Sequence, residues 1–597
     1  MSQPASFKNL PDLLAKAVAT YPNNKRFGTR VGPNNWEWMT YAEFGKAVDE
    51  FRGGLASLGV GKGDVVAVIA NNSPEWAVGA YATYSLGAFY VPMYEKQNAD
   101  DWTYIIEDSG ASVLLVAGDH IATKAGPLLD RIEGLEHMVN FAGGAGDAKS
   151  YQALRKHGAA NPVAAADPDP GDLCGLIYTS GTTGNPKGVQ LTHGNIISNV
   201  NAMQTLLPMK DDVSLSFLPW AHSFGQTLEL HVLTSFGCSS AIVDDVNQLI
   251  PYMSEVHPTL LFSVPRIFNK VYDSLNKKAA AAPPLRRGLM NAAFDNAMKR
   301  RQLASDGRSS GWVDFKHNLF DKLVFSKVRD LLGGQLRYAF SGGAAISKEV
   351  AEFIDNVGIT VYEGYGLSET SPVATANYPE NQRIGSVGKA IPGVEIIIDT
   401  AAVDNEMGDQ GEILIKGPNV MKGYHNLPDK TAEVLREDGA FRTGDLGRKD
   451  SEGYLYITGR IKEQYKLENG KYVVPAPLEE QLKLSGYINQ VMVFGANKLF
   501  NVAVIVPDAE AVEGWAKANG VSGDLAALCK DPKVKELIRG EVDKWSASKF
   551  KGFERIKEFR LIPDEFTTDN DMLTPTLKLK RRNVIKNYQH LLDEMYA

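Results

Sequence analysis

Tyr178-Thr179-Ser180-Gly181-Thr182-Thr183-Gly184-Asn185-Pro186-Lys187-Gly188 is the most informative stretch of this 597-residue sequence. Its glycines allow backbone N–H groups to approach an oxyanion, its hydroxyls donate further hydrogen bonds, and its lysine supplies a positive charge. An apolar run at 173–178 precedes it and predicts a buried strand, and 192–200 predicts the beginning of a helix. The stretch is not a Walker A loop, because that spacing requires Gly at 186 and Ser or Thr at 188, where Pro186 and Gly188 stand. Such a loop alone is more often a surface turn, but the motifs further along favour polyphosphate binding.

Alternating strand and helix patterns surround this loop. Apolar runs at 64–71, 111–117 and 259–264 predict buried strands, and the patterns at 41–58 and 75–86 predict helices between them. This alternation indicates a doubly wound α/β architecture.

The pattern changes in the second half of the chain. Segments 279–284 and 306–311 bracket a helical insertion. From 385 to 457 short alternating strands are predicted, for instance at 395–399, 412–416 and 454–458. After Arg460 a small α+β domain is expected to begin.

The composition is that of an ordinary globular protein, with 44% apolar and 22% charged residues. A net charge of −8 argues against nucleic acid as a partner. Cys174, Cys238 and Cys529 show no paired spacing, so neither disulfides nor a zinc site is predicted. Residues 1–11 lack a secretory signal pattern and no run of about eighteen apolar residues exists. We therefore expect a cytoplasmic protein without a membrane span.

Further motifs follow the loop in order: Ser341-Gly342-Gly343-Ala344-Ala345, Tyr362-Glu363-Gly364-Tyr365-Gly366-Leu367-Ser368-Glu369-Thr370, Gly411-Glu412, Phe441-Arg442-Thr443-Gly444-Asp445, Gly459-Arg460 and Leu573-Thr574-Pro575-Thr576-Leu577-Lys578-Leu579-Lys580-Arg581. This ordered set resembles the adenylate-forming superfamily of acyl-CoA synthetases, luciferases and peptide-synthetase adenylation domains. The resemblance runs from Trp38-Met39-Thr40-Tyr41 to the last of these motifs.

Within the superfamily the chain looks most similar to long-chain fatty acyl-CoA synthetases. The similarity lies in Ser73-Pro74-Glu75-Trp76, Val264-Pro265-Arg266-Ile267-Phe268, Leu319-Phe320-Asp321-Lys322-Leu323-Val324 and Leu573-Thr574-Pro575-Thr576. In addition, Gly459-Arg460-Ile461-Lys462-Glu463 resembles the bubblegum type of long-chain and very-long-chain enzymes.

The resemblance implies an α/β fold with a large N-terminal lobe and a small mobile α+β C-terminal domain. The lobe would consist of two doubly wound α/β subdomains and a β-barrel subdomain. We expect the N-terminal adenylation domain to span 1–458 and the C-terminal mobile domain 464–597. Residues 459–463 would form the hinge between them, with Glu463 as the hinge residue.

The resemblance also implies a nucleotide site. Thr179, Ser180, Thr182, Thr183 and Lys187 would contact the β- and γ-phosphates of ATP, and Ser368 the α-phosphate. Tyr365 would cover one face of adenine, opposite the backbone of Gly342, Gly343 and Ala344. Asp445 would bind the ribose hydroxyls, and Arg460 ribose or phosphate. The complete predicted set is Thr179, Ser180, Gly181, Thr182, Thr183, Gly184, Lys187, Gly342, Gly343, Ala344, Glu363, Gly364, Tyr365, Gly366, Ser368, Asp445, Ile457, Arg460 and Lys580.

The catalytic residues implied are Lys580, Thr179, Glu369 and His222. Lys580 lies four residues after Thr576, as in the Thr-x-x-Gly-Lys pattern of the family, and would bridge the carboxylate and the α-phosphate. Lys578 is its rival, because Lys578 and Leu579 stand where Ser and Gly are frequent in the family. Glu369 would hold Mg²⁺.

His222 is expected to be a wall or gate of the acyl pocket and not a general base. The pocket itself is expected from 220–230, 265–271 and 342–345. Gly470 and Lys471 would bind coenzyme A, with Gly470 giving pantetheine close passage along the backbone.

The predicted activity is ATP-dependent conversion of a long-chain fatty acid to acyl-AMP and then acyl-CoA, with fatty acid, ATP and coenzyme A as partners and Mg²⁺ as cofactor. An acyl-AMP ligase that delivers to a carrier protein, a luciferase-like oxygenase and a catalytically silent nucleotide-binding homologue are the alternatives. Peripheral association at the inner face of a membrane and a homodimer are left open.

Overall fold

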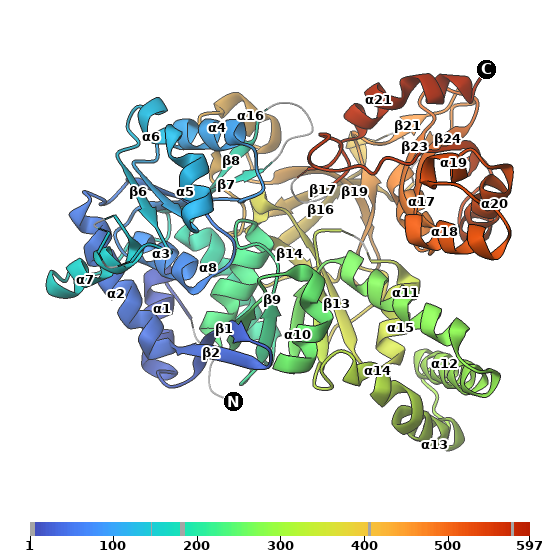
Figure 1. Ribbon diagram of the computed structural model, residues 1–597, viewed down its shortest axis with the longest axis horizontal. Helices are drawn as coiled ribbons and strands as arrows, with labels where there is room; N and C mark the ends of the chain where they lie inside the picture. Colours follow the sequence, from blue (N-terminus) through green and yellow to red (C-terminus); the bar gives the residue numbers. More distant parts are fainter. Residues whose placement is uncertain are drawn as a thin grey trace.

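The computed structural model describes residues 6–144, 146–147, 149–179, 185–344, 346–403, 408–574 and 578–597. Three sheets form the large N-terminal part of the protein and a smaller α+β unit follows it (Figure 1).

A seven-stranded sheet contains the loop motif at its edge. Its strand order is β18-β8-β7-β4-β3-β5-β6. The five strands from β7 to β6 in this order run parallel to one another. β8 is antiparallel to β7, and β18 to β8. The bounds are β3 (Val65–Ile69), β4 (Phe89–Met93), β5 (Val113–Val116), β6 (His137–Asn140), β7 (Leu173–Thr179), β8 (Lys187–Thr192) and β18 (Gly423–Tyr424).

Both faces of this sheet are covered, as a doubly wound fold requires. Val66 and Val68 of β3 belong to a core cluster that also contains Phe51 and Trp76 from α2 and α3. The alternate residues of the same strand lie in a second cluster with residues from α4 and α5, which include Trp102 and Ile121. Successive side chains of a strand point to opposite faces, so the continuous apolar runs in the sequence correspond to strands buried on both sides.

A nine-stranded sheet forms the second layer system, in the order β15-β14-β13-β12-β11-β9-β10-β1-β2. Its strands from β13 to β1 run parallel, and β14, β15 and β2 pair antiparallel at the two edges. The bounds are β1 (Lys25–Gly32), β2 (Asn35–Thr40), β9 (Val213–Ser216), β10 (Ser239–Ile242), β11 (Leu260–Ser263), β12 (Tyr338–Ser341), β13 (Thr360–Gly366), β14 (Val373–Ala376) and β15 (Lys389–Ala390).

The helices of the N-terminal part alternate with these strands. They are α1 (Leu10–Thr20), α2 (Tyr41–Ser57), α3 (Pro74–Tyr84), α4 (Ala99–Ser109), α5 (Asp119–Ala125), α6 (Pro127–Arg131), α7 (Tyr151–Ala160), α8 (His193–Leu206), η1 (Gly225–Val232), α9 (Leu233–Ser235), η2 (Val246–Gln248), α10 (Leu249–Val256), α15 (Lys348–Asn356), η4 (Ser368–Thr370), η5 (Thr400–Ala402) and α16 (Pro428–Val434). The strands and helices predicted at 64–71, 111–117, 259–264, 41–58 and 75–86 are therefore confirmed.

The helical insertion predicted between 279–284 and 306–311 is confirmed, and further helices extend it, so we call residues 284–331 the helical insertion. α11 (Pro265–Ala281) leads out of the nine-stranded sheet into α12 (Pro284–Ser305) and α13 (Gly311–Phe320), and η3 (Asp321–Phe325) and α14 (Ser326–Asp330) return the chain. In Figure 1, α12 and α13 project from the body at the lower right.

The third sheet differs from the expected barrel. Its strands β16 (Glu395–Asp399), β17 (Gly411–Lys416), β19 (Phe441–Lys449) and β20 (Leu455–Arg460) pair antiparallel in that order. The strands at 395–399, 412–416 and 454–458 are thus confirmed. Within the described ranges no pairing joins β16 to β20, so this unit is an open four-stranded sheet and the predicted closed barrel is wrong.

The C-terminal unit is α+β. Its sheet is β23 (Ile488–Phe494), β24 (Asn501–Pro507) and β25 (Ile556–Leu561), with β23 antiparallel and β25 parallel to β24. One face packs on α17 and α20, and the other packs on α21. The remaining bounds are β21 (Tyr465–Lys466), β22 (Tyr472–Val473), α17 (Pro475–Leu482), α18 (Ala509–Ala518), α19 (Leu525–Leu528), α20 (Pro532–Ser546) and α21 (Arg581–Glu594).

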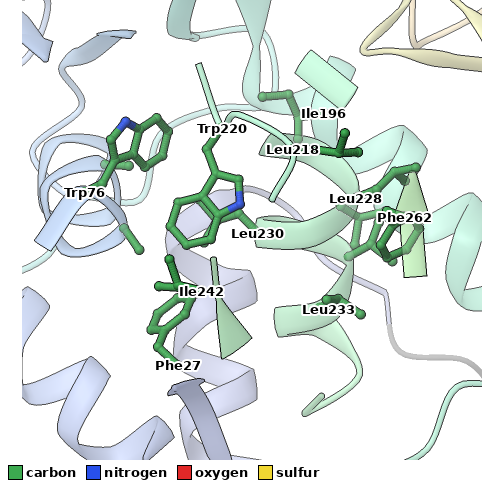
Figure 2. Close-up of a cluster of buried hydrophobic side chains, with 14 of the residues drawn as sticks. Phe27, Trp76, Ile196, Leu218, Trp220, Leu228, Leu230, Leu233, Ile242 and Phe262 are labelled. Atoms are coloured by element: carbon green, nitrogen blue, oxygen red, sulfur yellow. The ribbon is translucent and has the colours of Figure 1, made fainter. Parts of the chain in front are cut away.

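Trp220 lies in the core between the two large sheets (Figure 2). Its ring is fully buried and lies 5.7 Å from that of Phe27 and 5.6 Å from that of Trp76. The π-helical segment η1 follows, and the buried Arg26 donates hydrogen bonds to its Glu229 and Leu230 carbonyls at 3.1 and 2.9 Å. The segment 220–230, expected to line an acyl pocket, therefore begins in the hydrophobic core.

In the part of the chain that the structure describes, no helix is both long and apolar enough to span a bilayer.

Candidate active site

The β7–β8 hairpin carries the loop motif. Thr179 ends β7 and pairs in antiparallel register with Lys187, which begins β8. Thr192, at the end of β8, caps α8, because its side chain accepts a hydrogen bond from the Asn195 N–H. Ser180, Gly181, Thr182, Thr183 and Gly184 lie outside the described residues, so their phosphate contacts stay a prediction.

Lys187 and Glu369 both contact Tyr424. The Lys187 ammonium is 4.7 Å from the centroid of the Tyr424 ring, and the Tyr424 hydroxyl donates to Glu369 Oε1 at 2.8 Å. Burial, together with the negative charge of Glu369, raises the pKa of Tyr424 above its ordinary value. The predicted phosphate-binding lysine and the predicted metal ligand are therefore joined through one tyrosine ring.

Tyr424 is a residue that the sequence analysis missed. It reaches the site because β18 pairs with β8, with Tyr424 opposite Val189. The two strands are more than two hundred residues apart in sequence, and no local pattern around 423–424 indicates the pairing.

Tyr365, Asp445 and Arg460 form a second group. The Tyr365 hydroxyl donates to Asp445 Oδ2 at 2.7 Å, and Arg460 Nε lies 3.0 Å from Asp445 Oδ1. Asp445 and Arg460 face each other across β19 and β20. Asp445 raises the pKa of Arg460, and burial, with Asp445 second, raises that of Tyr365. The carboxylate is buried and held by two donors, which fixes its position.

The glycine motifs end neighbouring parallel strands. Ser341 of β12 pairs with Glu363 of β13, so Gly342 and Gly343 emerge beside 364–366 at one edge of the sheet. Gly343 has a φ of +80°, and a side chain at Gly342 would meet the Phe224 ring at 3.0 Å. Ligands of open α/β sheets bind at such carboxyl-end edges.

Other predicted nucleotide residues surround this edge. Burial raises the pKa of the Glu363 carboxyl to about 8. Hydrogen bonds from the backbone N–H groups of Gly385 and Ile346 act in the other direction and lower it. Ser368 Oγ lies 3.1 Å from Ser223 Oγ. Ile457, on β20, and Tyr365 pack against the same apolar cluster. Ala344 follows the Gly342-Gly343 turn and is exposed.

The C-terminal lysine that reaches this region is Lys578. Desolvation and then Arg460 lower the pKa of the Lys578 ammonium, whereas Asp445, Glu369 and Glu463 act to raise it. By its surface area Lys578 is exposed, so the charges of these groups act on it without enclosing the residue. These interactions bring Lys578 into the same electrostatic environment as the predicted ribose and metal ligands.

Lys580, the preferred candidate from the sequence, points elsewhere. Its ammonium forms an ion pair with Asp571. Burial raises the pKa of Asp101, on α4, and the charge of Lys580 acts to lower it. Its backbone N–H donates to the Met572 carbonyl at 2.8 Å, immediately before α21 begins at Arg581. Of the two lysines, it is therefore the rival Lys578 whose charge interacts with Asp445 and Glu369, and the choice between the two stays a prediction.

Arg581 anchors the segment that follows these lysines. Its guanidinium binds both carboxylate oxygens of the buried Glu479, at 2.8 and 2.7 Å, and the Val493 carbonyl at 2.9 Å. A bidentate pair of this kind adds geometric specificity. The sequence analysis quoted Arg581 only as the last residue of the C-terminal motif and gave it no role.

His222 is half-buried, and its role as a wall of the acyl pocket stays a prediction. Its Nδ1 accepts a hydrogen bond from the Phe224 N–H at 3.2 Å. Desolvation, with the charge of Lys578 second, lowers the pKa of its ring to about 4. The imidazole is therefore neutral near pH 7.

The predicted hinge and coenzyme A residues lie in the chain after β20. The N–H groups of Glu463 and Gln464 both donate to the Arg460 carbonyl, at 3.2 and 3.1 Å. Gly470 has a φ of +82° at the turn between β21 and β22, and the neighbouring Lys471 is exposed. The roles of these residues stay predictions.

Comparison with known proteins identifies the family. The AMP-binding enzyme model matches residues 14–425, and the model of the AMP-binding enzyme C-terminal domain matches 462–597. The chain belongs to this family of adenylate-forming enzymes and is an acyl-activating, AMP-forming ligase.

Relatives and solved structures agree with this membership. The chain is 36% identical to the long-chain-fatty-acid–CoA ligase FadD15 of Mycobacterium bovis, over 94% of this chain and 92% of that protein. It is 33% identical to the long-chain-fatty-acid–CoA ligase 6 of Mus musculus, over 99% and 87% respectively. The crystal structure of the adenylation domain of a carboxylate reductase from Mycobacterium chelonae superposes with a TM-score of 0.79 at 21% identity, covering 98% of this chain and 91% of that one.

Replacing Asp445 with asparagine should weaken nucleotide binding. The substitution keeps the size of the side chain but removes the charge that holds Arg460 at 3.0 Å and that would accept the ribose hydroxyls. Hydrogen bonds to charged groups contribute about 1.5–3 kcal/mol, so KM for ATP should rise about 10- to 100-fold in pyrophosphate exchange. Asp450→Asn is the control, because Asp450 pairs with Arg383 in the turn after the same strand. An unchanged KM in Asp445→Asn would remove Asp445 from the site.

Proposed function

We propose that the protein is a long-chain fatty acid–CoA ligase. It would convert fatty acid and ATP to acyl-AMP and pyrophosphate, and then acyl-AMP and coenzyme A to acyl-CoA and AMP. The observation that carries this proposal is the geometry of the two groups, in which Asp445 binds Tyr365 and Arg460 at 2.7 and 3.0 Å while Tyr424 contacts both Lys187 and Glu369. The names of the relatives support a long-chain acid as the substrate.

Nucleotide binding would use the two groups already described. Asp445 would accept hydrogen bonds from the ribose hydroxyls, and Tyr365, whose hydroxyl binds Asp445, would cover adenine. Lys187 would oppose the charge of the β- and γ-phosphates. Its neighbours in the loop at 180–184 would add backbone donors.

Adenylation requires two anions to approach. A carboxylate oxygen attacks the α-phosphorus, and the bond from that phosphorus to pyrophosphate breaks. Lys578 would bridge the carboxylate and the α-phosphate, since a flexible ammonium stabilises the charge that develops between them. His222 is neutral and would not compete for the carboxylate as a second cation.

Glu369 fits a magnesium ion that arrives with the nucleotide. The described residues contain no cluster of three or more His, Cys, Asp or Glu side chains suited to a metal, and Glu369 contributes a single carboxylate beside Tyr424 and Lys187. Mg²⁺ commonly takes one or two carboxylates and completes its shell with phosphate oxygens and water. When bound, the ion would neutralise charge on the departing pyrophosphate.

Thioester formation would follow in the same site. The coenzyme A thiol attacks the acyl carbonyl, the thiol proton is released, and the carbon–oxygen bond to AMP breaks. Lys578 must leave the α-phosphate for pantetheine to approach. The turn with Gly470 and Lys471 would then line its path, since a glycine with positive φ leaves the backbone open there.

One assay separates the proposed function from the alternatives. The protein is incubated with ATP, Mg²⁺ and palmitate, with and without coenzyme A, and AMP, acyl-AMP and acyl-CoA are measured. Coenzyme A-dependent AMP release with palmitoyl-CoA is the expected result. Acyl-AMP without any transfer to coenzyme A would favour a carrier-protein ligase, acyl-AMP with oxygen consumption a luciferase-like oxygenase, and no turnover a silent homologue.

We expect a strong preference for long acids. The grounds are the helical insertion and Val264-Pro265-Arg266, which resemble long-chain enzymes, together with the names of the relatives. Each methylene removed from water contributes about 0.8 kcal/mol, or about fourfold in kcat/KM while the chain still fits. A series from acetate through octanoate to palmitate should rise by orders of magnitude. Equal kcat/KM for acetate and palmitate would contradict the long-chain proposal.

A further inference from the structure

The helical insertion presents most of the exposed apolar surface. Of the twelve large apolar side chains that are exposed among the described residues, eight lie between 285 and 331. These eight include both of the exposed aromatic residues, Trp312 and Phe315. Clustered exposed apolar side chains mark an interaction surface, whereas single ones are normal.

Four of the eight form one stripe along α13 and η3. Trp312 and Phe315 are 64% and 61% exposed, and Leu319 and Leu323 are 49% and 42% exposed. The spacing of three, four and four residues puts them on one face of the helix. We call these four residues the apolar stripe.

The opposite face of the same segment already has a partner. Val324 and Phe325 belong to a buried cluster with residues of α11 and α12, and Val313 is buried as well. The apolar stripe is thus a second apolar face, which core packing does not use. Its two aromatic rings stack on each other, with centroids 5.8 Å apart and an interplanar angle of 11°.

The insertion is basic in an acidic protein. Residues 284–331 contain ten Lys and Arg against five Asp, a net charge of +5, whereas the whole chain carries −8. Two of these aspartates bind arginines of the insertion, with Asp314 at 2.8 Å from Arg300 and Asp321 at 2.7 Å from Arg329. Lys316 lies 4.9 Å from the Trp312 ring centroid, and Lys322 is exposed beside Leu323.

We propose that the apolar stripe and its flanking lysines dock the protein on an anionic phospholipid bilayer. Aromatic and leucine side chains insert at the boundary between headgroups and acyl chains, while lysines reach the phosphates. A second copy of this chain fits the stripe less well, because two insertions of charge +5 would repel each other. The proposal does not depend on the proposed enzymatic activity.

The shape of the protein allows this docking. α12 and α13 project from the body, so that their outer end can meet a surface without the large sheets intervening (Figure 1). α11 connects this insertion to Val264, which lies 4.0 Å from the position a side chain would take at Gly343 of the candidate site. A bilayer held at the stripe is therefore connected through α12 and α11 to the region of the site.

Vesicle flotation tests the proposal on the full-length protein. One set of vesicles is phosphatidylcholine alone, and the other is phosphatidylcholine with phosphatidylglycerol. The protein should float with the anionic vesicles, float weakly with the neutral ones, and dissociate as salt is raised, because the surface attraction is screened. Absence of binding to anionic vesicles at low salt would overturn the proposal.

Variants locate the binding surface. Trp312→Ser/Phe315→Ser should lower the partition coefficient at least tenfold. Lys316→Glu/Lys322→Glu should lower it more than about tenfold, since each lysine near an anionic surface contributes about 1 kcal/mol and each reversal adds repulsion. Leu499→Ser is the matched control, because Leu499 is 69% exposed but lies in the C-terminal unit. Equal partition of the Trp312/Phe315 variant and the Leu499 variant would contradict docking through the stripe.

Two further measurements exclude other occupants. Phospholipids brominated in the acyl chain should quench tryptophan fluorescence of the bound protein, and Trp312→Phe should remove that quenching while binding persists. Sedimentation without vesicles checks for self-association. A wild-type dimer that becomes a monomer in Trp312→Ser/Phe315→Ser would show that the stripe is an interface between copies, and would overturn the lipid assignment. Thermal unfolding of each variant confirms that it is folded.

Discussion

Alanine at Lys578 is expected to abolish most adenylate formation. We predict a loss of about 10²–10³-fold in kcat for palmitate-dependent pyrophosphate exchange, the usual cost of removing one preorganised group that stabilises transition-state charge. Arg460 lowers the pKa of the Lys578 ammonium and Asp445 and Glu369 act to raise it, so its charge interacts with the predicted ribose and metal ligands. Thioester formation from supplied acyl-AMP should change little, because the bridging charge is needed only while phosphorus is attacked.

Lys580→Ala is the matched control for this experiment. It removes an ammonium of the same type two residues away, one that pairs with Asp571 instead of the site residues. The expected result is nearly unchanged pyrophosphate exchange in Lys580→Ala. The reverse outcome, with Lys580→Ala inactive and Lys578→Ala active, would restore the motif spacing counted from Thr576. Retained partial activity in Lys578→Arg would support a role of charge.

The choice between these two lysines cannot be made from the spacing of the motif alone. Lys580 is directed by non-local contacts: its N–H binds the Met572 carbonyl, its ammonium binds Asp571, and α21 begins directly after it. Asp571 itself has a φ of +58°, so a turn creates this partner. A count of residues along the motif contains none of this information. It could therefore name the two candidates but not choose between them.

The fold was predictable wherever the signal is local. The apolar run at 64–71 predicts β3 because both faces of that strand are buried, and Thr192 predicts the beginning of α8 because its side chain caps the helix. The prediction of a barrel was wrong for a different reason. Alternation identifies strands such as β16 and β20, but whether the two edges pair depends on sheet geometry, which alternation does not encode.

The candidate site follows the same division. Asp445, Glu369 and Lys187 were recognised from local motifs, and the structure brings the first into contact with Arg460 and joins the other two through Tyr424. Tyr424 was missed because only the pairing of β18 with β8 brings it there. Non-local strand pairing thus supplies the connection between residues that motifs can only name separately.

Proline at Glu463 is expected to separate the two half-reactions. Arg460 lowers the pKa of the Lys578 ammonium, and Asp445 and Glu369 act to raise it, so we propose that the two domains have here the arrangement that adenylation needs. Thioester formation needs Lys578 to leave, which a rotation of the C-terminal domain about the segment after β20 would achieve. Hinges are a few residues that absorb a large backbone change, and proline fixes φ near −65°. We therefore predict that Glu463→Pro loses about 10²-fold or more in acyl-CoA formation from supplied acyl-AMP, an effect comparable to removing a residue that positions substrate.

Adenylation should survive this substitution. The N–H groups of Glu463 and Gln464 both donate to the Arg460 carbonyl, at 3.2 and 3.1 Å, which describes a helix-like turn. A φ near −65° is compatible with such a turn. Proline removes only the Glu463 donor, at a cost of about 1 kcal/mol, and Gln464 keeps its own bond to the same carbonyl. Proline also disfavours the helical conformation of the preceding Lys462, so a modest loss of thermal stability is expected.

Charge must be separated from backbone stiffness, because Glu463 also acts on its neighbours. Its carboxylate raises the pKa of Arg460 and opposes the lowering of that of Lys578. Glu463→Ala removes this charge but leaves φ free, so it is the matched control. Both half-reactions should stay within a few-fold of the wild-type rate, because an ion pair exposed to solvent contributes about 0.2–1 kcal/mol. Pyrophosphate exchange and acyl-CoA yield from supplied acyl-AMP are measured separately for both variants. Equal losses of pyrophosphate exchange and acyl-CoA yield in Glu463→Pro would indicate misfolding. A loss that Glu463→Ala shares would assign the effect to charge. Full activity of Glu463→Pro in both assays would place the hinge elsewhere.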